Sequence, residues 1–184
     1  LDLAGTCLGV QEKEKVVTGE SIAPGDVIVG VPSSGIHSNG LTLARRVVEE
    51  YASYDTLLAN GRTLGEELLT PTRIYAEVLR VTEACTVHGM CHITGGGLLN
   101  FSRLSGYGFS ITDPLEVPAI FRWLQETGGI GDVEMYRTFN MGMGYAFVVP
   151  AASVPVIQSL VPDARVVGKV TEEPGVRLEG VEMR

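Results

Sequence analysis

The chain has 184 residues, of which 45% are hydrophobic and 20% charged, so we expect one globular domain over residues 1–184. Its net charge of −8, with no run rich in lysine and arginine, argues against nucleic acid and anionic membranes as partners. A small-molecule partner is favoured, and a phosphorylated one would need directed N–H dipoles or a few placed cations.

The start of the chain, residues 1–10, lacks an initiator methionine and a basic flank, so it does not resemble a signal peptide. It is apolar enough that we expect it to be packed, and the chain to be a fragment of a longer protein. No apolar run approaches the roughly 18 residues that span a bilayer. We therefore expect a soluble, cytoplasmic protein.

In the first half of the chain, the turn at residues 24–26 leads into an apolar run, residues 27–31, which predicts a strand covered on both faces. Helical spacing of Ala44, Val47, Val48 and Tyr51 predicts a helix over residues 41–51. The pair Thr70-Pro71 is typical of a helix start and predicts a second helix that ends near Cys85, with Ile74, Val78 and Val81 on its inner face.

In the second half, strands and helices continue to alternate. Strands are expected at residues 87–94, 108–112, 144–149, 164–170 and 176–180, and helices at 98–104, 118–126, 132–139 and 153–160. Adjacent strands near the end favour a mixed sheet with helices layered on it, an α/β (α+β) fold, over a pure Rossmann arrangement. A strand, a glycine loop and a helix follow one another twice in this pattern.

The three cysteines, Cys7, Cys85 and Cys91, are odd in number and form no C-x-x-C pair. This argues against a disulfide framework and against a tetrahedral zinc site. We interpret them as small core residues.

The loop after the first strand has a composition suited to an anion. It contains Pro32, Ser33, Ser34, Gly35, Ile36, His37, Ser38, Asn39 and Gly40. The glycines allow inward-pointing N–H groups, the short polar side chains add hydrogen bonds, and the following helix presents its positive end. The alternative is a polar capped turn. His37, which we expect to be exposed to ligand, could donate to phosphate or shuttle a proton, or could serve only as a hydrogen-bonded turn residue.

The second loop, residues 92–98, holds three consecutive glycines, Gly95, Gly96 and Gly97. Such clustering indicates either close approach of a ligand to the backbone or tight packing. His88 and His92 share one face of the preceding strand, but no third ligand is nearby. We therefore predict two polar strand residues and no metal site.

The third segment, residues 134–144, contains one cation, Arg137. Its guanidinium suits a phosphate or carboxylate, although a salt bridge with Glu134 is an alternative. Asn140, ahead of Gly142 and Gly144, suits a turn at the mouth of a strand. The methionines are interpreted as core residues.

Four strings in this order, SSGIHSNG, LLTPTRIY, HITGGGL and EMYRTFNMGMG, resemble the AIR synthetase (phosphoribosylformylglycinamidine cyclo-ligase) family over nearly the whole chain. The resemblance implies an enzyme that uses ATP with magnesium to close the imidazole ring of formylglycinamidine ribonucleotide, and that works as a homodimer. It covers only the C-terminal α/β portion. The strings DGVGTK and TGET, associated with the N-terminal ATP-binding domain, are absent, so this chain is expected to be inactive alone.

The resemblance also implies a substrate and phosphate site. Its residues would be Ser34, Gly35, Ser38, Asn39, Gly40, Thr94, Gly95, Gly96, Gly97, Asn140 and Gly142, with His37 as candidate catalytic residue and no metal ligand. Arg137 joins this set through its own chemistry. Alternatives are a related member of the superfamily, namely selenophosphate synthetase, thiamine-monophosphate kinase, a hydrogenase maturation factor or formylglycinamidine ribonucleotide synthetase, or a phosphate-binding or dimerisation module without catalysis.

Overall fold

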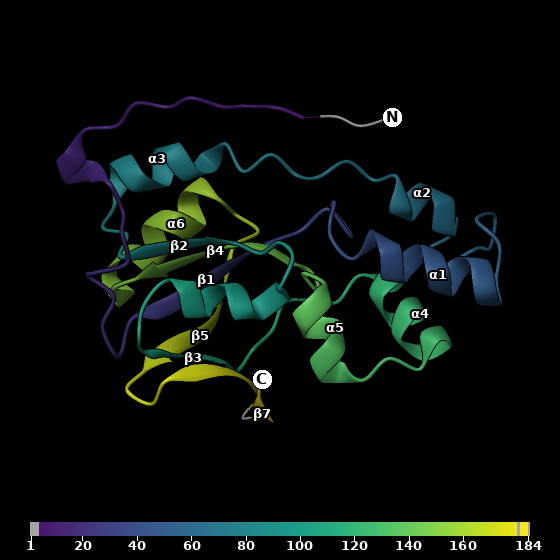
Figure 1. Cartoon of the computed structure of the whole chain (residues 1–184). Coiled ribbons are helices and arrows are strands. Elements are labelled where there is room, and N and C mark those ends of the chain that lie inside the picture. The colour runs from purple at the N-terminus through teal and green to yellow at the C-terminus, as the bar shows by residue number, and fades with distance from the viewer. Residues whose placement is uncertain (1–3, 180, 184) are drawn as a thin grey trace.

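The computed structural model describes residues 4–179 and 181–183, and within them a single mixed sheet forms the centre of the fold (Figure 1). Its seven strands are β1 (Val27–Pro32), β2 (Gly89–His92), β3 (Gly108–Ile111), β4 (Met143–Val149), β5 (Arg165–Thr171), β6 (Gly175–Leu178) and β7 (Val181–Glu182). They lie in the order β2-β4-β1-β5-β3-β6-β7, and each neighbouring pair is antiparallel except β3 and β6, which are parallel.

The helices cover both faces of the sheet and one of its ends. The α-helices are α1 (Leu41–Tyr51), α2 (Leu64–Leu68), α3 (Glu77–Ala84), α4 (Ala119–Gly128), α5 (Asp132–Thr138) and α6 (Val154–Leu160), and the 3₁₀ helices are η1 (Lys13–Lys15), η2 (Gly97–Arg103) and η3 (Ala151–Ser153). In Figure 1, α3 and α6 lie above the sheet, whereas α1, α2, α4 and α5 gather beyond its right end. No helix in the described part of the chain is long and apolar enough to cross a membrane.

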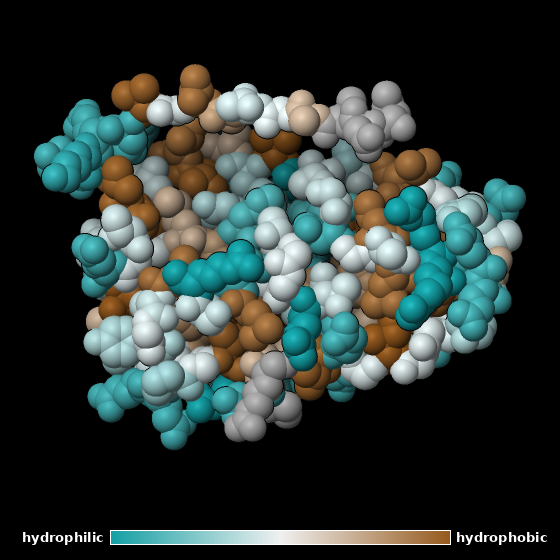
Figure 2. All heavy atoms as spheres, in the orientation of Figure 1, coloured by the Kyte–Doolittle hydropathy of each residue, from teal (hydrophilic) through white to brown (hydrophobic). Residues whose placement is uncertain are grey.

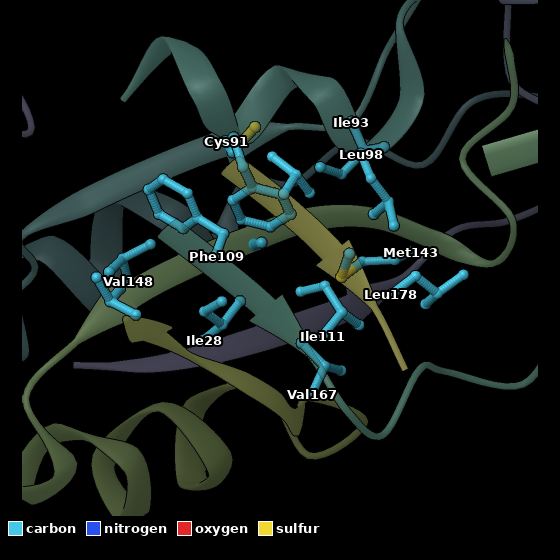
Figure 3. Close-up of a cluster of buried hydrophobic side chains, with 14 of the residues drawn as sticks. Ile28, Cys91, Ile93, Leu98, Phe109, Ile111, Met143, Val148, Val167 and Leu178 are labelled. Atoms are coloured by element: carbon cyan, nitrogen blue, oxygen red, sulfur yellow. The ribbon is translucent and has the colours of Figure 1, made fainter. Parts of the chain in front are cut away.

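Three apolar clusters follow from this arrangement. Alternate residues of β1 point to opposite faces, so Val29 and Val31 pack with α3 and α6, while Ile28 packs with η2. Figure 3 shows the cluster under η2, to which Phe109 of β3 and Leu98 of η2 both belong. A third cluster joins α1, α2, α4 and α5. Both faces of the sheet are therefore buried at β1, as its continuous apolar run predicts, whereas β5 exposes part of one face.

Most of the predicted elements are confirmed, including the mixed α/β sheet, the strand at β1 and the helix at α1, whose residues Ala44, Val47 and Val48 are buried. Tyr51 is not part of that buried stripe and is 57% exposed. The predicted helix over residues 98–104 forms as the 3₁₀ helix η2. The short helix α2 was not predicted, although its capping box, in which Thr63 and Glu66 bond each other's backbone, is visible in the sequence.

The prediction of a helix start at Thr70-Pro71 is wrong, because α3 begins only at Glu77. The preceding residues are extended and bond to the end of β1, with Arg73 N–H donating to Ser34 Oγ at 2.9 Å and Tyr75 Oη donating to the Pro32 carbonyl at 3.1 Å. Tertiary hydrogen bonds therefore override the local helix signal. Ile74, which we predicted on the inner face of that helix, is 85% exposed.

The expectation that residues 1–10 are packed is wrong for those that the structure describes. Residues 4–10 have no regular secondary structure and are exposed, with Leu8 94% accessible. Cys7 lies in this segment and is exposed, so it is not a core residue, whereas Cys91 is buried and Cys85 half-buried. All three thiols are free.

Candidate functional site

Three segments that are distant in sequence meet where β1 and β2 end and β4 begins. β4 lies between β1 and β2 and runs antiparallel to both, so its first residues meet the last residues of the other two. Backbone hydrogen bonds join them, from Ser33 N–H to the Gly142 carbonyl at 2.8 Å and from Ile93 N–H to the Gly144 carbonyl at 2.9 Å. The three sequence motifs are therefore parts of one site.

Asn140 connects the third segment to the first loop. Its side-chain amide donates to the Gly35 carbonyl at 2.8 Å, and its Oδ1 accepts from Gly142 N–H at 2.9 Å. Asn140 is only 4% exposed, so both bonds are shielded from water. Asn140 therefore holds the first loop in place through these bonds. Its side-chain amide does not face solvent.

The two glycine loops also touch each other. A Cβ built on Gly95 would lie 3.3 Å from Oδ1 of Asn39. Gly95 therefore allows the second loop to come against the first, and a larger residue would push the polar tip of Asn39 aside. The contact places the residues expected to hold phosphate, from both loops, on one continuous surface.

The first loop offers unpaired backbone donors. Residues 36–39 form a turn, and no hydrogen bond in the described structure uses the backbone N–H groups of residues 35–38 and 40, which the eleven-residue helix α1 follows directly. Gly35, Ile36 and His37 are buried, and buried N–H groups in proteins nearly always have a partner. The described part of the chain therefore leaves these donors unused, which suits an anionic ligand. Ser34 N–H is not among them, because His37 caps it internally.

His37 is buried, with 5% of its surface exposed, so the expectation of an exposed histidine is wrong. Its Nε2 accepts a hydrogen bond from Ser34 N–H at 3.1 Å, so the proton of the neutral ring lies on Nδ1. Nδ1 is buried and has no partner within the described residues. Nε2 thus has a structural role as a turn cap, and Nδ1 is a neutral donor that remains available.

Two aromatic rings lie near His37, and a third extends the group beyond His92. Its ring centroid lies 6.3 Å from that of Tyr75 and 6.5 Å from that of His92, and Tyr145 lies 6.1 Å from His92. Burial lowers the pKa of His37, and the nearby His92 lowers it further; partial burial also lowers the pKa of His92. His37 is therefore neutral at pH 7 and holds a proton without carrying a charge.

This environment predicts a loss of stability in mild acid. A histidine whose folded pKa lies below its ordinary value of 6.5 binds its proton more readily when unfolded, so its contribution is intact above pH 6.5 and lost as the pH falls toward the folded pKa. Thermal melts between pH 7.5 and 5 should therefore show a falling melting temperature. His37→Asn should flatten this slope, and an unchanged slope in that variant would contradict the assignment.

The three glycines of the second loop have different surroundings. A Cβ on Gly97 would overlap the backbone carbonyl of Tyr136 and lie 2.9 Å from that of Phe139, so the packing interpretation holds there. Gly96, at φ +100°, is less crowded, because a Cβ there would only make ordinary contacts with Asn100 Nδ2 at 3.7 Å and Arg103 Nη2 at 3.8 Å. Thr94 contributes its carbonyl, which accepts from Gly97 N–H at 2.9 Å. Only Gly95 and Gly96 leave room for a ligand.

Arg137 is exposed, and within the described residues no hydrogen bond or ion pair connects it to either glycine loop. The alternative salt bridge with Glu134 is absent from the same region, because Glu134 accepts a hydrogen bond from Thr138 at 3.0 Å. His88 pairs with Asp26 at 2.8 Å rather than with His92. Among the described residues, no three His, Cys, Asp or Glu side chains are placed together to hold a metal ion.

Sequence reasoning missed Arg73, Tyr75 and Tyr145 as parts of the site. Ser34 Oγ donates to the Pro71 carbonyl at 2.7 Å, which brings the extended segment before α3 against the first loop. The Arg73 guanidinium then lies over the Tyr75 ring, 5.2 Å from its centroid. The string LLTPTRIY contained Arg73 and Tyr75, but the helix signal of its Thr-Pro pair hid their role, and Tyr145 lies in β4 just beyond the third motif.

The comparison with known families agrees with this geometry. Residues 23–181, which include all three segments of the site, match the family described as AIR synthase related protein, C-terminal domain. The chain belongs to this family. The matched range includes strands β1 to β6 and both glycine loops.

Proteins named phosphoribosylformylglycinamidine cyclo-ligase are similar to this AIR synthase domain over nearly its whole length. The protein of Methanococcoides burtonii is 50% identical over 185 residues, covering 99% of this chain and 55% of the relative. That of Thermococcus kodakarensis is 49% identical over 182 residues, covering 97% and 54%. The chain thus spans about half the length of the curated relatives it matches.

Solved structures with the same fold share much less sequence. Thiamine-monophosphate kinase from Stenotrophomonas maltophilia has a TM-score of 0.60 at 19% identity, covering 90% of this chain and 54% of the kinase. The hydrogenase maturation protein HypE from E. coli has a TM-score of 0.55 at 21% identity, covering 90% and 50%. At these identities the likeness concerns the fold alone.

Proposed function

We propose that the chain is the C-terminal portion of a phosphoribosylformylglycinamidine cyclo-ligase, which closes the imidazole ring of formylglycinamidine ribonucleotide with ATP in purine biosynthesis. The observation that carries the proposal is the identity of about 50% to proteins of that name over 99% of this chain. Relatives with other names are similar at about 20% identity, which supports no choice of substrate among them.

In this function the first loop would hold the negatively charged part of the substrate. The N–H groups of residues 35–38 and 40 and the N-terminus of α1 would supply the donors, assisted by the side chains of Ser38 and Asn39. Gly95 and Gly96 would form the opposite wall, and Gly97, Asn140 and Gly142 would hold the two walls in place.

His37 would act through Nδ1. A neutral N–H donor, fixed by the bond from Ser34 N–H to Nε2, can bind an oxygen that gains negative charge during the reaction. ATP activates the formamide oxygen of the substrate by phosphorylation, and a substrate nitrogen then displaces it as phosphate. We propose that His37 donates to an oxygen at this reacting centre, because its ring is buried and does not carry a charge.

The residues that bind ATP and magnesium would lie outside this chain. The described residues offer no group of three metal-ligating side chains, which supports placing the metal ligands in the part of the relatives that this chain does not match. We also propose a homodimer and a cytoplasmic location, in keeping with a small-molecule biosynthetic enzyme.

The isolated chain should therefore bind substrate without turning it over. We expect heat from titration with formylglycinamidine ribonucleotide in a calorimeter, but no ADP release when ATP is added, because the groups that hold ATP would lie in the part of the relatives that this chain does not match. A hybrid enzyme, in which the part of the Methanococcoides burtonii relative that this chain does not match is fused to this chain, should regain ATP-dependent ring closure. Turnover by the isolated chain would refute the proposal that ATP binding requires the part of the relatives that this chain does not match.

The alternative is a related member of the superfamily or a module without catalysis. A hybrid that binds a different phosphorylated compound and leaves formylglycinamidine ribonucleotide unchanged would favour a related enzyme. Absence of heat with any phosphorylated ligand would instead favour a structural or dimerisation role.

A further inference from the structure

The proposed site needs a positive charge that the residues considered so far do not supply. The chain has a net charge of −8, and a phosphate group would be repelled by that overall field unless a cation is placed next to it. Arg73 is close to the first loop, but its guanidinium is bound by Glu77 at 2.5 Å and by Asp163 at 2.6 Å. Its charge is therefore already balanced.

Arg103, at the end of η2, lies beside the second glycine loop. Its Nη2 lies 3.8 Å from the position of a Cβ on Gly96, beside the open part of the second loop. Arg103 is exposed, and among the described residues it takes part in no ion pair and no hydrogen bond through its guanidinium. Its full charge remains available at the glycine loop.

The geometry of η2 explains why Arg103 faces this loop. A 3₁₀ helix has three residues per turn, so side chains three apart lie on one face, here those of Asn100 and Arg103. Asn100 is buried and its Nδ2 donates to the carbonyls of Gly97 at 2.8 Å, Thr94 at 3.4 Å and Gly95 at 3.4 Å. By binding these acceptors, Asn100 keeps them from facing a ligand.

The contacts link this cation to the first loop. Arg103 borders Gly96, and the neighbouring residue Gly95 lies against Asn39, whose loop carries the unused N–H groups of residues 35–38 and 40. An anion held by those donors would therefore have a guanidinium available from the facing loop. A planar guanidinium can give two parallel hydrogen bonds to phosphate, which makes arginine well suited to this position.

We propose that Arg103, rather than Arg137, is the arginine that binds the phosphate of the ribonucleotide, while Asn100 positions the loop on which it acts. This inference rests on the proposed function for the identity of the ligand. The assignment of a phosphate contact to Arg103 stands on its own geometry and can be tested separately.

The test compares Arg103→Gln with the matched control Arg137→Gln in the isolated chain. Calorimetry would measure the affinity for formylglycinamidine ribonucleotide, for its dephosphorylated riboside and for ribose 5-phosphate. We expect Arg103→Gln to weaken binding of both phosphorylated compounds by roughly 10- to 100-fold, the range of a charge-assisted hydrogen bond, and to leave riboside binding unchanged. Arg137→Gln should alter none of the three affinities.

Further variants and outcomes separate the two ideas. Arg103→Lys should recover part of the loss, since a point charge remains, and the melting temperature of all three variants should match that of the parent chain.

If the parent binds the ribonucleotide and Arg103→Gln binds it equally well, the role of Arg103 is overturned and the proposed function stands. If the parent binds ribose 5-phosphate through Arg103 but not the ribonucleotide, the proposed function fails and the phosphate contact stands. A parent chain that binds no phosphorylated compound overturns both.

Discussion

Replacing Gly97 by alanine should destabilise the fold by about 3–5 kcal/mol, which is a large part of the stability of a typical domain. The added Cβ would overlap the backbone carbonyl of Tyr136, which α5 holds in place, and the residue would sit at a φ of +51°. Backbone on both sides leaves no flexible side chain to move away. Chemical denaturation of the isolated chain, followed by circular dichroism, measures the change.

Gly96→Ala is the matched control for this result. Its Cβ would meet no atom closer than 3.7 Å, so only the strain of a φ of +100° remains, and we expect a loss of about 1–2 kcal/mol. Because Gly96 faces the proposed ligand space, this variant should lose ribonucleotide affinity while staying folded, and Gly96→Val should lose more. Equal destabilisation at both positions would show that the second loop serves packing alone.

His37→Asn should lower ring closure by the hybrid enzyme about 10²- to 10³-fold, the effect of removing one fixed donor at a reacting oxygen. Asparagine tolerates the left-handed backbone at this position, where φ is 58°, better than most residues, so the loop can keep its course. The lost bond from Ser34 N–H should reduce the melting temperature by only about 2–8 °C. Initial rates and thermal melts on the same preparations separate the two effects.

His88→Asn provides the comparison for His37. His88 precedes β2, whereas the site lies where β2 ends, and its partner is Asp26 rather than a loop residue. We expect this variant to keep the activity of the hybrid enzyme within about twofold, since it touches none of the reacting groups. A His37 variant with a lowered melting temperature but full specific activity would contradict a catalytic role. His37 would then serve only to cap the turn through Nε2.

The sequence alone determined those parts of the fold that depend on neighbours along the chain. The spacing of Ala44, Val47 and Val48 placed α1, and the apolar run at residues 27–31 placed β1 as a strand buried on both faces. The order of four motifs indicated the family that the match over residues 23–181 then showed. Periodicity and turn chemistry act over a few residues, so one sequence is enough to read them.

Only the tertiary structure decided how these pieces serve the site. Thr70-Pro71 has every local feature of a helix start, yet hydrogen bonds to the end of β1 keep Arg73 and Tyr75 extended. The three glycines look alike in sequence, but α5 packs against Gly97 and leaves Gly96 open. His37 is buried and Arg103 faces the glycine loop because β2, β4 and η2 meet there. Such contacts join residues far apart along the chain, and local preference carries no information about them.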